Sequence, residues 1–223
     1  MGMALLELKD IVKVYDGGQK VAALNGVSLS VEAGELAAVA GPSGSGKSTL
    51  LNIAGTLDAP TRGHVLFEGR ELTKLGGAAL ADFRLSNLGF IFQAYNLIGV
   101  LSALENVEYV LLLQGVEAGE RRERAREALK RVGLAREADR RPDHLSGGQQ
   151  QRVAVARAVV GRPRLILADE PTANLDSKTA ESLLDLMVEL NEESGATFLF
   201  SSHDERVLSR AHRVVRMRDG QVV

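Results

Sequence analysis

The sequence predicts an α/β fold with a mostly parallel sheet, and two observations favour it. Short apolar segments, followed by glycine or acidic residues, alternate with segments of helical periodicity along the 223 residues. Segments 36–40 and 165–168 contain no polar residue, which is typical of strands buried on both faces of a parallel sheet. Apolar residues make up 45% of the chain and charged residues 25%, as in a folded globular domain.

The individual elements follow from periodicity in chain order. Segments 5–15 and 27–31 alternate polar and apolar side chains, as half-buried strands do. The other expected strands are short and mostly apolar, at 36–40, 88–92, 165–168 and 197–201. The expected helices are at 47–56, 79–84, 103–113, 118–132, 149–160 and 177–192. This alternation of strands and helices favours a parallel sheet.

The middle of the chain shows helical periodicity only. We therefore expect one domain of 1–223, in which a helical subdomain of 94–157 is inserted into a core of 1–93 and 158–223. Its charged part, 118–141, interleaves acids with bases, which favours a solvated helix with ion pairs over a site for an anionic partner. The expected pairs are Glu117 with Arg121, Glu120 with Arg124, and Glu127 with Arg131.

Composition excludes several classes of protein. With no cysteine there is no disulfide scaffold, cysteine-ligated metal site or thiol nucleophile. The net charge of −2 lacks the excess of positive charge typical of nucleic-acid-binding proteins, so we expect no nucleic-acid partner. Apolar runs are far shorter than the roughly 18–20 residues of a spanning helix, and the first residues lack the pattern of a signal peptide. Any membrane role would come through a partner chain.

Segment 41–49, Gly-Pro-Ser-Gly-Ser-Gly-Lys-Ser-Thr, fits the phosphate-loop pattern G-x-x-x-x-G-K-[ST]. It follows an apolar strand and begins a helix, as this motif requires, and that context disfavours an ordinary glycine-rich turn. Lys47 supplies a charge for the β- and γ-phosphates, and the Ser48 hydroxyl is a ligand for Mg²⁺. The expected nucleotide-binding residues of the loop are Gly41, Ser43, Gly44, Ser45, Gly46, Lys47, Ser48 and Thr49.

Two acids follow the strand at 165–168. Asp169 can hold Mg²⁺ through water, and Glu170 can orient and polarise a water for attack on the γ-phosphate. Alone, such a pair is as often a helix cap. Beside a phosphate loop it predicts a magnesium–nucleotide site, and we expect the two loops to leave adjacent strands at the same sheet edge.

Segment 145–149, Leu-Ser-Gly-Gly-Gln, precedes a long helix. Ser146 is a natural N-cap, and Gly147 and Gly148 leave backbone N–H groups free beside the helix terminus, so Ser146, Gly147, Gly148 and Gln149 form a candidate anion site. Ordinary helix capping is the alternative. It is disfavoured because all five residues match a known sequence signature and are followed by Gln150, Gln151 and Arg152.

Together these motifs resemble the ATP-binding subunits of ABC transporters, over essentially the whole chain. No Asn-Lys-x-Asp guanine-recognition motif occurs, which disfavours GTPases. The resemblance implies a phosphate-loop NTPase core with an antiparallel β subdomain near the N-terminus, and hydrolysis of ATP with Mg²⁺. It implies that Gln93 touches Mg²⁺ and the attacking water, that His203 binds the γ-phosphate, and that Asp176 contacts the opposite phosphate loop across a dimer. Tyr15 resembles the aromatic that stacks on adenine, with an ordinary strand tyrosine as the alternative.

Segments 88–97 and 168–176 are similar to the lipoprotein-releasing and macrolide-export group. That group implies an ATP-bound homodimer beneath an integral membrane permease with an extracytoplasmic domain, on the cytoplasmic side of the inner membrane. Such a complex transports a substrate or transmits force. An ATPase of a cell-division-type regulatory complex stays open as an alternative. A soluble nucleic-acid or ribosome ABC protein is disfavoured, because neither a second cassette nor a coiled-coil insertion is present.

The segment after Gln93 is unusually apolar, with Tyr95, Leu97, Ile98, Val100 and Leu101 in seven residues. One interpretation is a hydrophobic groove for a short helix of the membrane subunit. The other is subdomain core, and the sequence leaves both open.

Overall fold

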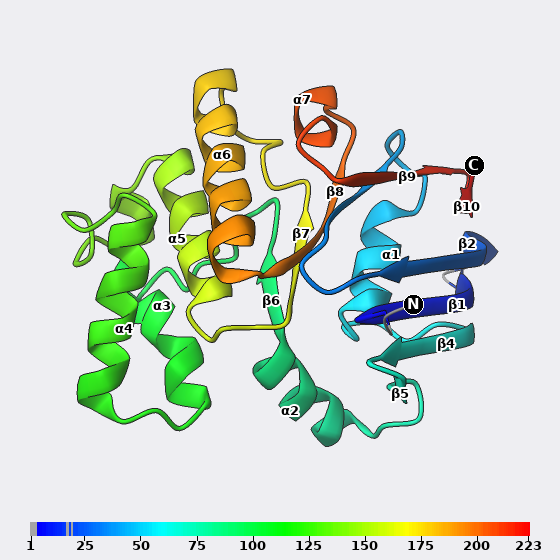
Figure 1. Cartoon of the computed structure of the whole chain (residues 1–223), viewed down its shortest axis with the longest axis horizontal. Helices are drawn as coiled ribbons and strands as arrows, with labels where there is room; N and C mark the ends of the chain where they lie inside the picture. The colour runs from blue at the N-terminus through cyan, green and yellow to red at the C-terminus, as the bar shows by residue number, and fades with distance from the viewer. Residues whose placement is uncertain (1–3, 17, 19) are drawn as a thin grey trace.

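The computed structural model describes residues 4–16, 18 and 20–223, and it has three layers (Figure 1). Alternate side chains of the central strands enter two different cores. Leu36, Ala38 and Ala40 pack with the helices of one face, whereas Ala37 and Val39 pack with the elements of the other face. This double burial explains why the strand contains no polar residue.

The central sheet has six strands in the order β10-β9-β3-β8-β7-β6. All neighbours are parallel except the final β9–β10 pair, which is antiparallel. This confirms the expected mostly parallel sheet. The strands are β3 (Leu36–Ala40), β6 (Leu88–Ile91), β7 (Leu165–Asp169), β8 (Thr197–Ser202), β9 (Arg213–Arg218) and β10 (Gln221–Val222).

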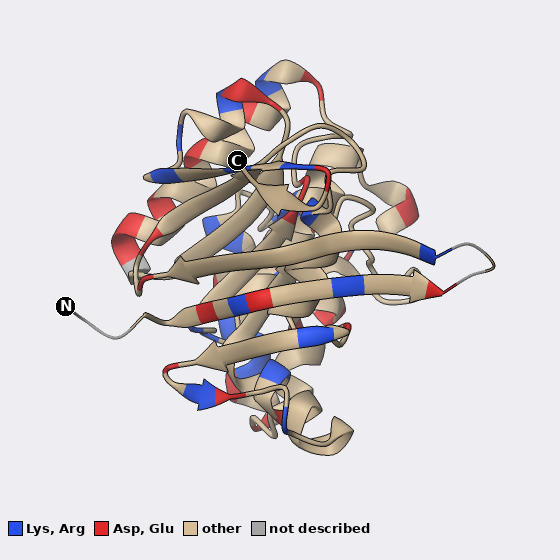
Figure 2. Cartoon of the chain, turned by 90° about the vertical axis from the view of Figure 1, so that its right-hand side faces the viewer, with Lys and Arg blue, Asp and Glu red and all other residues tan. Residues whose placement is uncertain are grey.

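A second, antiparallel sheet forms the other outer layer, in the order β2-β1-β4-β5. Its strands are β1 (Leu6–Asp16), β2 (Lys20–Val31), β4 (Arg62–Phe67) and β5 (Arg70–Glu71). Figure 2 shows its long strands side by side, with β2 uncharged beyond Lys20. The antiparallel subdomain expected near the N-terminus is therefore confirmed, and it packs on α1 (Lys47–Ala54) and the central sheet.

The remaining helices pack mainly on the opposite face of the central sheet (Figure 1). One core cluster joins α3, α4, α5 and α6 to β3, β7 and β8, so the helices of 94–157 share a core with the sheet. Their bounds are α2 (Gly77–Asn87), α3 (Ala103–Leu113), α4 (Ala118–Arg131), η1 (Pro142–His144), α5 (Gly147–Val159), α6 (Ser177–Ser194) and α7 (Glu205–Leu208). None of the helices in the described part of the chain combines the length and apolarity that crossing a bilayer requires.

Several elements differ from expectation. The strand expected at 27–31 is the end of the twelve-residue β2. The strands β4, β5, β9 and β10 and the short α7 were not predicted, because their polar or charged residues hide the apolar signal. In β9, for example, only Met217 is fully buried. Tertiary pairing forms such strands even where local patterning is weak.

The ion pairs on α4 also differ in part. Arg124 binds Glu120 at 3.3 Å, as expected. Glu117 instead caps the helix by accepting a hydrogen bond from the Gly119 N–H, and Arg131 reaches Glu193 of α6 at 2.7 Å. Arg131 and Glu193 lie on different helices, and spacing along one helix cannot predict such a pair.

Candidate active site

The phosphate loop joins β3 to α1, and its backbone passes so close to neighbouring segments that two positions require glycine. A Cβ on Gly41 would lie 2.3 Å from the Met217 carbonyl oxygen, and one on Gly46 would lie 2.6 Å from that of Ala23. Gly46 also has a φ of 99°, in the left-handed region that glycine tolerates best. Tight wrapping at these two positions directs the loop around the N-terminus of α1.

Lys47 occupies the centre of this loop and is only 7% exposed. Its ammonium donates hydrogen bonds to the carbonyl oxygens of Gly41 at 2.8 Å and Pro42 at 3.1 Å. It also lies 3.5 Å from Oε1 of Glu170. A cation held in this way is pre-positioned for an anionic ligand in front of the loop.

Asp169 and Glu170, at the end of β7, lie next to the phosphate loop, although β3 and β7 are not neighbours. The expectation of adjacent strands is wrong, because β8 lies between them. The Ser48 hydroxyl nevertheless donates to Oδ1 of Asp169 at 3.0 Å, so the two motifs meet directly. Ser201 of β8 also donates to that oxygen, at 2.5 Å. Sequence analysis missed Ser201, since it appeared only as the end of an apolar strand.

Glu170 follows β7 in a strained conformation, with a φ of 45°. A non-glycine residue held this way costs of order 1–3 kcal/mol, and such residues cluster at functional sites. Its carboxylate Oε1 lies 3.0 Å from Nδ1 of His203. The strain therefore accompanies a carboxylate that faces both Lys47 and His203.

A cavity of about 400 Å³ opens in front of these groups. It brings together side chains from β2, the phosphate loop, the ends of β6, β7 and β8, and the segment after Glu170. The lining residues are Val21, Ala22, Ala23, Ser43, Gly44, Gly46, Lys47, Ser48, Thr49, Gln93, Glu170, Ala173 and His203. The three predicted catalytic residues and six of the eight phosphate-loop residues thus converge.

The donor set of this cavity fits a magnesium–nucleotide. Within the described residues no group of three or more histidine, aspartate and glutamate side chains could hold a metal by itself. Mg²⁺ in such sites takes one or two protein oxygens and completes its shell with phosphate and water, so Ser48 and Asp169 suffice. The buried Ser45 hydroxyl has no hydrogen-bond partner among the described residues, and Ser45 does not line the cavity.

Tyr15 lies near the end of β1 and is not among the residues lining the cavity. Its ring is 42% exposed, and Lys13 Nζ lies 4.8 Å from the ring centroid. Its hydroxyl donates to Asp58 at 2.9 Å. Partial burial would raise the pKa of Asp58, but hydrogen bonds from Lys13 and Tyr15 outweigh it and lower that pKa. Stacking of adenine on Tyr15 stays a prediction.

Segment 145–149 leads into α5, and none of its residues lines the cavity of its own chain. Ser146 caps the helix by accepting from the Gln149 N–H at 3.3 Å, while Gln149 Oε1 accepts from the Ser146 N–H at 2.9 Å. A Cβ on Gly148 would lie 2.4 Å from the Thr179 methyl carbon, so this turn packs tightly. The local capping is formed, and the anion-binding role of these residues stays a prediction.

Asp176 begins α6 beside this turn. Its carboxylate accepts hydrogen bonds from the hydroxyl of Thr179 at 2.6 Å and from its backbone N–H at 3.0 Å. The Thr179 hydroxyl lowers the pKa of Asp176, and the backbone bond adds to the effect. Asp176 is exposed, so it is available to a second molecule.

The segment after Gln93 is tied to the helices by buried polar groups. Asn106 is 1% exposed and accepts from the Ile98 N–H at 2.8 Å. Its amide donates to the carbonyl oxygens of Ile98, Leu101 and Ser102. Leu97 packs on the main core, whereas Val100 is 74% exposed. The five apolar residues of this segment therefore do not form a single exposed face.

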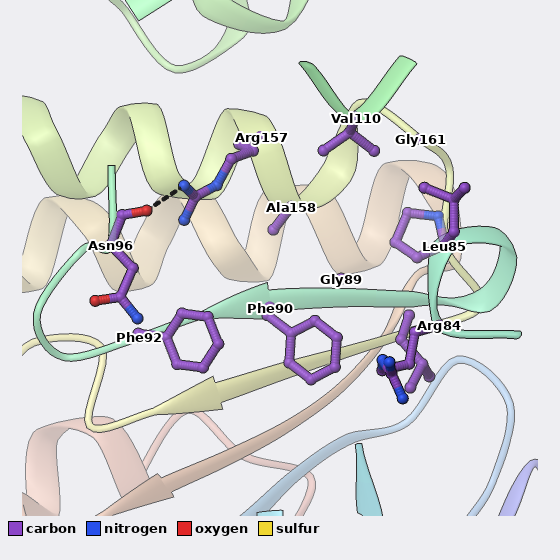
Figure 3. A pocket seen from close by; sticks show the side chains of 12 residues that line it. Arg84, Leu85, Gly89, Phe90, Phe92, Asn96, Val110, Arg157, Ala158 and Gly161 are labelled. Atoms are coloured by element: carbon purple, nitrogen blue, oxygen red, sulfur yellow. Dashed lines mark hydrogen bonds between the residues drawn. The ribbon is translucent and has the colours of Figure 1, made fainter. Parts of the chain in front are cut away.

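A separate groove of about 350 Å³ lies beside this segment, between α2, β6, α3 and α5. Figure 3 shows Phe90 and Phe92 along one wall and Val110 and Ala158 along the other. Arg157 donates to the carbonyl oxygen of Asn96 at 2.5 Å, which fixes one end (Figure 3). Burial lowers the pKa of Arg157. Phe92, which lines the groove, directly precedes Gln93 in the sequence.

Comparison with known proteins decides the family. The sequence profile described as ABC transporter matches residues 24–173, which contain the phosphate loop, the segment 145–149 and the acidic strand end. The chain belongs to the ABC transporter ATP-binding family. This ABC protein is an ATPase domain with the α/β fold expected for that family.

Three relatives have similar sequences. The ABC domain is 51% identical over 219 residues to an uncharacterized ABC transporter ATP-binding protein of Thermotoga maritima, covering 98% of this chain and 93% of the relative. It is 47% identical to the lipoprotein-releasing system ATP-binding protein LolD of Geobacter metallireducens, covering 99% and 98%. It is 48% identical to the macrolide export ATP-binding/permease protein MacB of Hyphomonas neptunium, where 98% of this chain matches only 34% of the longer protein. The resemblance to the lipoprotein-releasing and macrolide-export group is confirmed.

A solved structure of the ATP-binding cassette MJ0796, a dimer in a post-hydrolysis state bound to ADP and Pi, has the same fold. It is 45% identical, has a TM-score of 0.91, and the match covers 97% of this chain and 96% of that one. The roles of the individual site residues stay predictions that the geometry above supports.

Proposed function

We propose that this ABC ATPase powers a membrane transporter or mechanotransmission complex by closing as a head-to-tail homodimer around two Mg·ATP. The observation that carries the proposal is the convergence of Lys47, Ser48, Gln93, Glu170 and His203 on one cavity. These residues come from separate segments, and each has the chemistry that phosphoryl transfer needs.

Within the cavity each side chain has a distinct task. Lys47 neutralises the charge on the phosphates, and Ser48 with Asp169 and Gln93 would hold Mg²⁺, which would supply positive charge to stabilise the phosphates. Glu170 accepts a proton from the attacking water, and His203, 3.0 Å from that carboxylate, donates toward the γ-phosphate. Catalysis is then positioning together with charge stabilisation.

The position of residues 145–149 supports the dimer. Ser146 is exposed at the N-terminus of α5, yet no residue of 145–149 lines the cavity among those the structure describes. A second copy turned head to tail would bring Ser146, Gly147 and Gly148 against the nucleotide, with Asp176 facing the opposite phosphate loop. The related cassette MJ0796 is dimeric with ADP and Pi.

The partner is an integral membrane permease with an extracytoplasmic domain, and the ATPase lies on the cytoplasmic side of the inner membrane. The relative MacB is an ATP-binding/permease protein in which the matched part is 34% of the length. The groove beside Gln93, with Phe90, Phe92 and Val110 in its walls, supports docking of a short apolar helix there. Movement of Gln93 on nucleotide closure would reach the permease through Phe92.

Assays of hydrolysis, dimerisation and permease recovery test this proposal. The purified protein should hydrolyse ATP only with Mg²⁺ and should elute as a dimer when ATP is bound. From detergent-solubilised membranes of the native host, the tagged protein should co-purify with a permease. Phe92→Asp should lose the permease and keep basal hydrolysis, whereas Val223→Asp, at an exposed apolar residue that does not line the groove, should keep both. Equal recovery of the permease by both variants would exclude the groove.

A further inference from the structure

A buried hydroxyl lies behind the catalytic carboxylates and bonds to both of the residues that carry them. Ser201 is on β8, opposite Asp169 in the parallel β7–β8 register, and is fully buried. Its Oγ donates to Asp169 Oδ1 at 2.5 Å and accepts from the Glu170 backbone N–H at 3.1 Å. It does not line the nucleotide cavity. It can therefore act on the reaction only through its neighbours.

We propose that Ser201 is a positioning residue for ATP hydrolysis, which sets the orientation of the Asp169 carboxylate and the backbone conformation of Glu170. This deepens the proposed function and rests on Asp169 and Glu170 acting as described there. The hydroxyl suits both tasks because it is a donor and an acceptor at once.

The first task concerns Asp169. Its Oδ1 receives two donors, from Ser201 at 2.5 Å and from Ser48 at 3.0 Å. Two donors on one oxygen fix the rotation of the carboxylate and leave the other oxygen free for a metal-bound water. Without Ser201, Ser48 alone would hold Asp169, and Ser48 is itself a predicted metal ligand.

The second task concerns Glu170, whose φ of 45° is uncommon for a residue with a side chain. Its N–H is shared between the Ser201 carbonyl oxygen at 3.2 Å and the Ser201 hydroxyl at 3.1 Å. These bonds hold the conformation that directs the carboxylate to within 3.0 Å of His203 and 3.5 Å of Lys47. Removal of the hydroxyl would leave only the longer bond.

The test compares Ser201→Ala with Thr197→Val in the full chain, with Mg²⁺ and ATP varied independently. Thr197 is a matched control, since it is a buried hydroxyl on the same strand that also accepts from a backbone N–H, that of Gly34 at 2.9 Å. It lies at the strand end away from the cavity. Ser201→Thr keeps the hydroxyl and serves as the conservative variant.

We expect Ser201→Ala to lower kcat about tenfold, a loss of one donor to a catalytic group, and to raise the Mg²⁺ concentration for half-maximal activity severalfold. The Kd for ATP should stay within about threefold, because Lys47 and the loop are untouched. Ser201→Thr should recover most of kcat, and Thr197→Val should match the wild type. If Ser201→Ala keeps a wild-type kcat and Mg²⁺ dependence, or if Thr197→Val loses as much, Ser201 has only a structural role. A wild-type protein without ATPase activity would overturn the proposed function as well.

Discussion

Glu170→Gln isolates the chemical step from nucleotide binding. The amide has nearly the shape of the carboxylate, so the side chain can keep its place beside His203 at 3.0 Å and Lys47 at 3.5 Å. It cannot accept a proton from water. Loss of a general base typically slows the reaction by about 10²–10⁴, which corresponds to about 3–5 kcal/mol in the barrier.

The affinity for ATP, unlike the rate of hydrolysis, should not fall in Glu170→Gln. At 3.5 Å, Lys47 and Glu170 attract each other by about 5 kcal/mol before desolvation is counted, at an effective dielectric constant near 20. The neutral amide releases most of that attraction and removes a negative charge that would repel the γ-phosphate. The affinity for ATP should therefore be unchanged or higher, and the ATP-bound dimer should persist.

The assay combines steady-state phosphate release, ATP binding by calorimetry, and light scattering after size-exclusion chromatography. Glu192→Gln, the same change at an exposed position of α6, is the control and should behave as the wild type. Hydrolysis by Glu170→Gln within about threefold of the wild-type rate would show that another group is the base. Loss of ATP binding would show instead that Glu170 supports the site mainly through Lys47.

Three other predictions address binding, assembly and stability. If adenine stacks on Tyr15, Tyr15→Phe should bind ATP like the wild type, whereas Tyr15→Ala should weaken binding by about tenfold; equal Kd values for both variants in calorimetry would leave Tyr15 a strand residue tied to Asp58. Lys47→Ala and Ser146→Arg should each abolish hydrolysis, but mixed subunits should regain part of it, because one of the two shared sites then carries neither defect; no recovery from a proven heterodimer would place Ser146 in its own chain's site. Asn106→Ala should lower the free energy of unfolding by about 3 kcal/mol in urea denaturation, since it leaves the partly buried Ile98 N–H and Leu101 carbonyl oxygen unsatisfied; a change under about 1 kcal/mol would show that water replaces the amide.

Much of this protein is determined locally by its sequence. The phosphate loop was predictable because its glycines, Lys47 and Ser48 must lie at fixed, short spacings for one loop to wrap around a phosphate. The strand before the loop is also apolar throughout. The bounds of β3 and α3 agree with those predicted, since an unbroken apolar segment and helical periodicity are strong local signals. The family motifs then identified the candidate site residues by their order along the chain.

The tertiary structure decided what depends on pairing between distant segments. The insertion of β8 between β3 and β7 follows from strand order, which no local pattern encodes, and the pairing of β8 with β7 places Ser201 beside Asp169 and Glu170. A strand such as β9 forms because β3 and β10 supply its hydrogen bonds, so its own residues are free to be charged. The groove of Phe90, Phe92 and Val110 likewise exists only where one strand and three helices meet. Such features arise from long-range packing, in which each segment's environment is provided by residues far away in the chain.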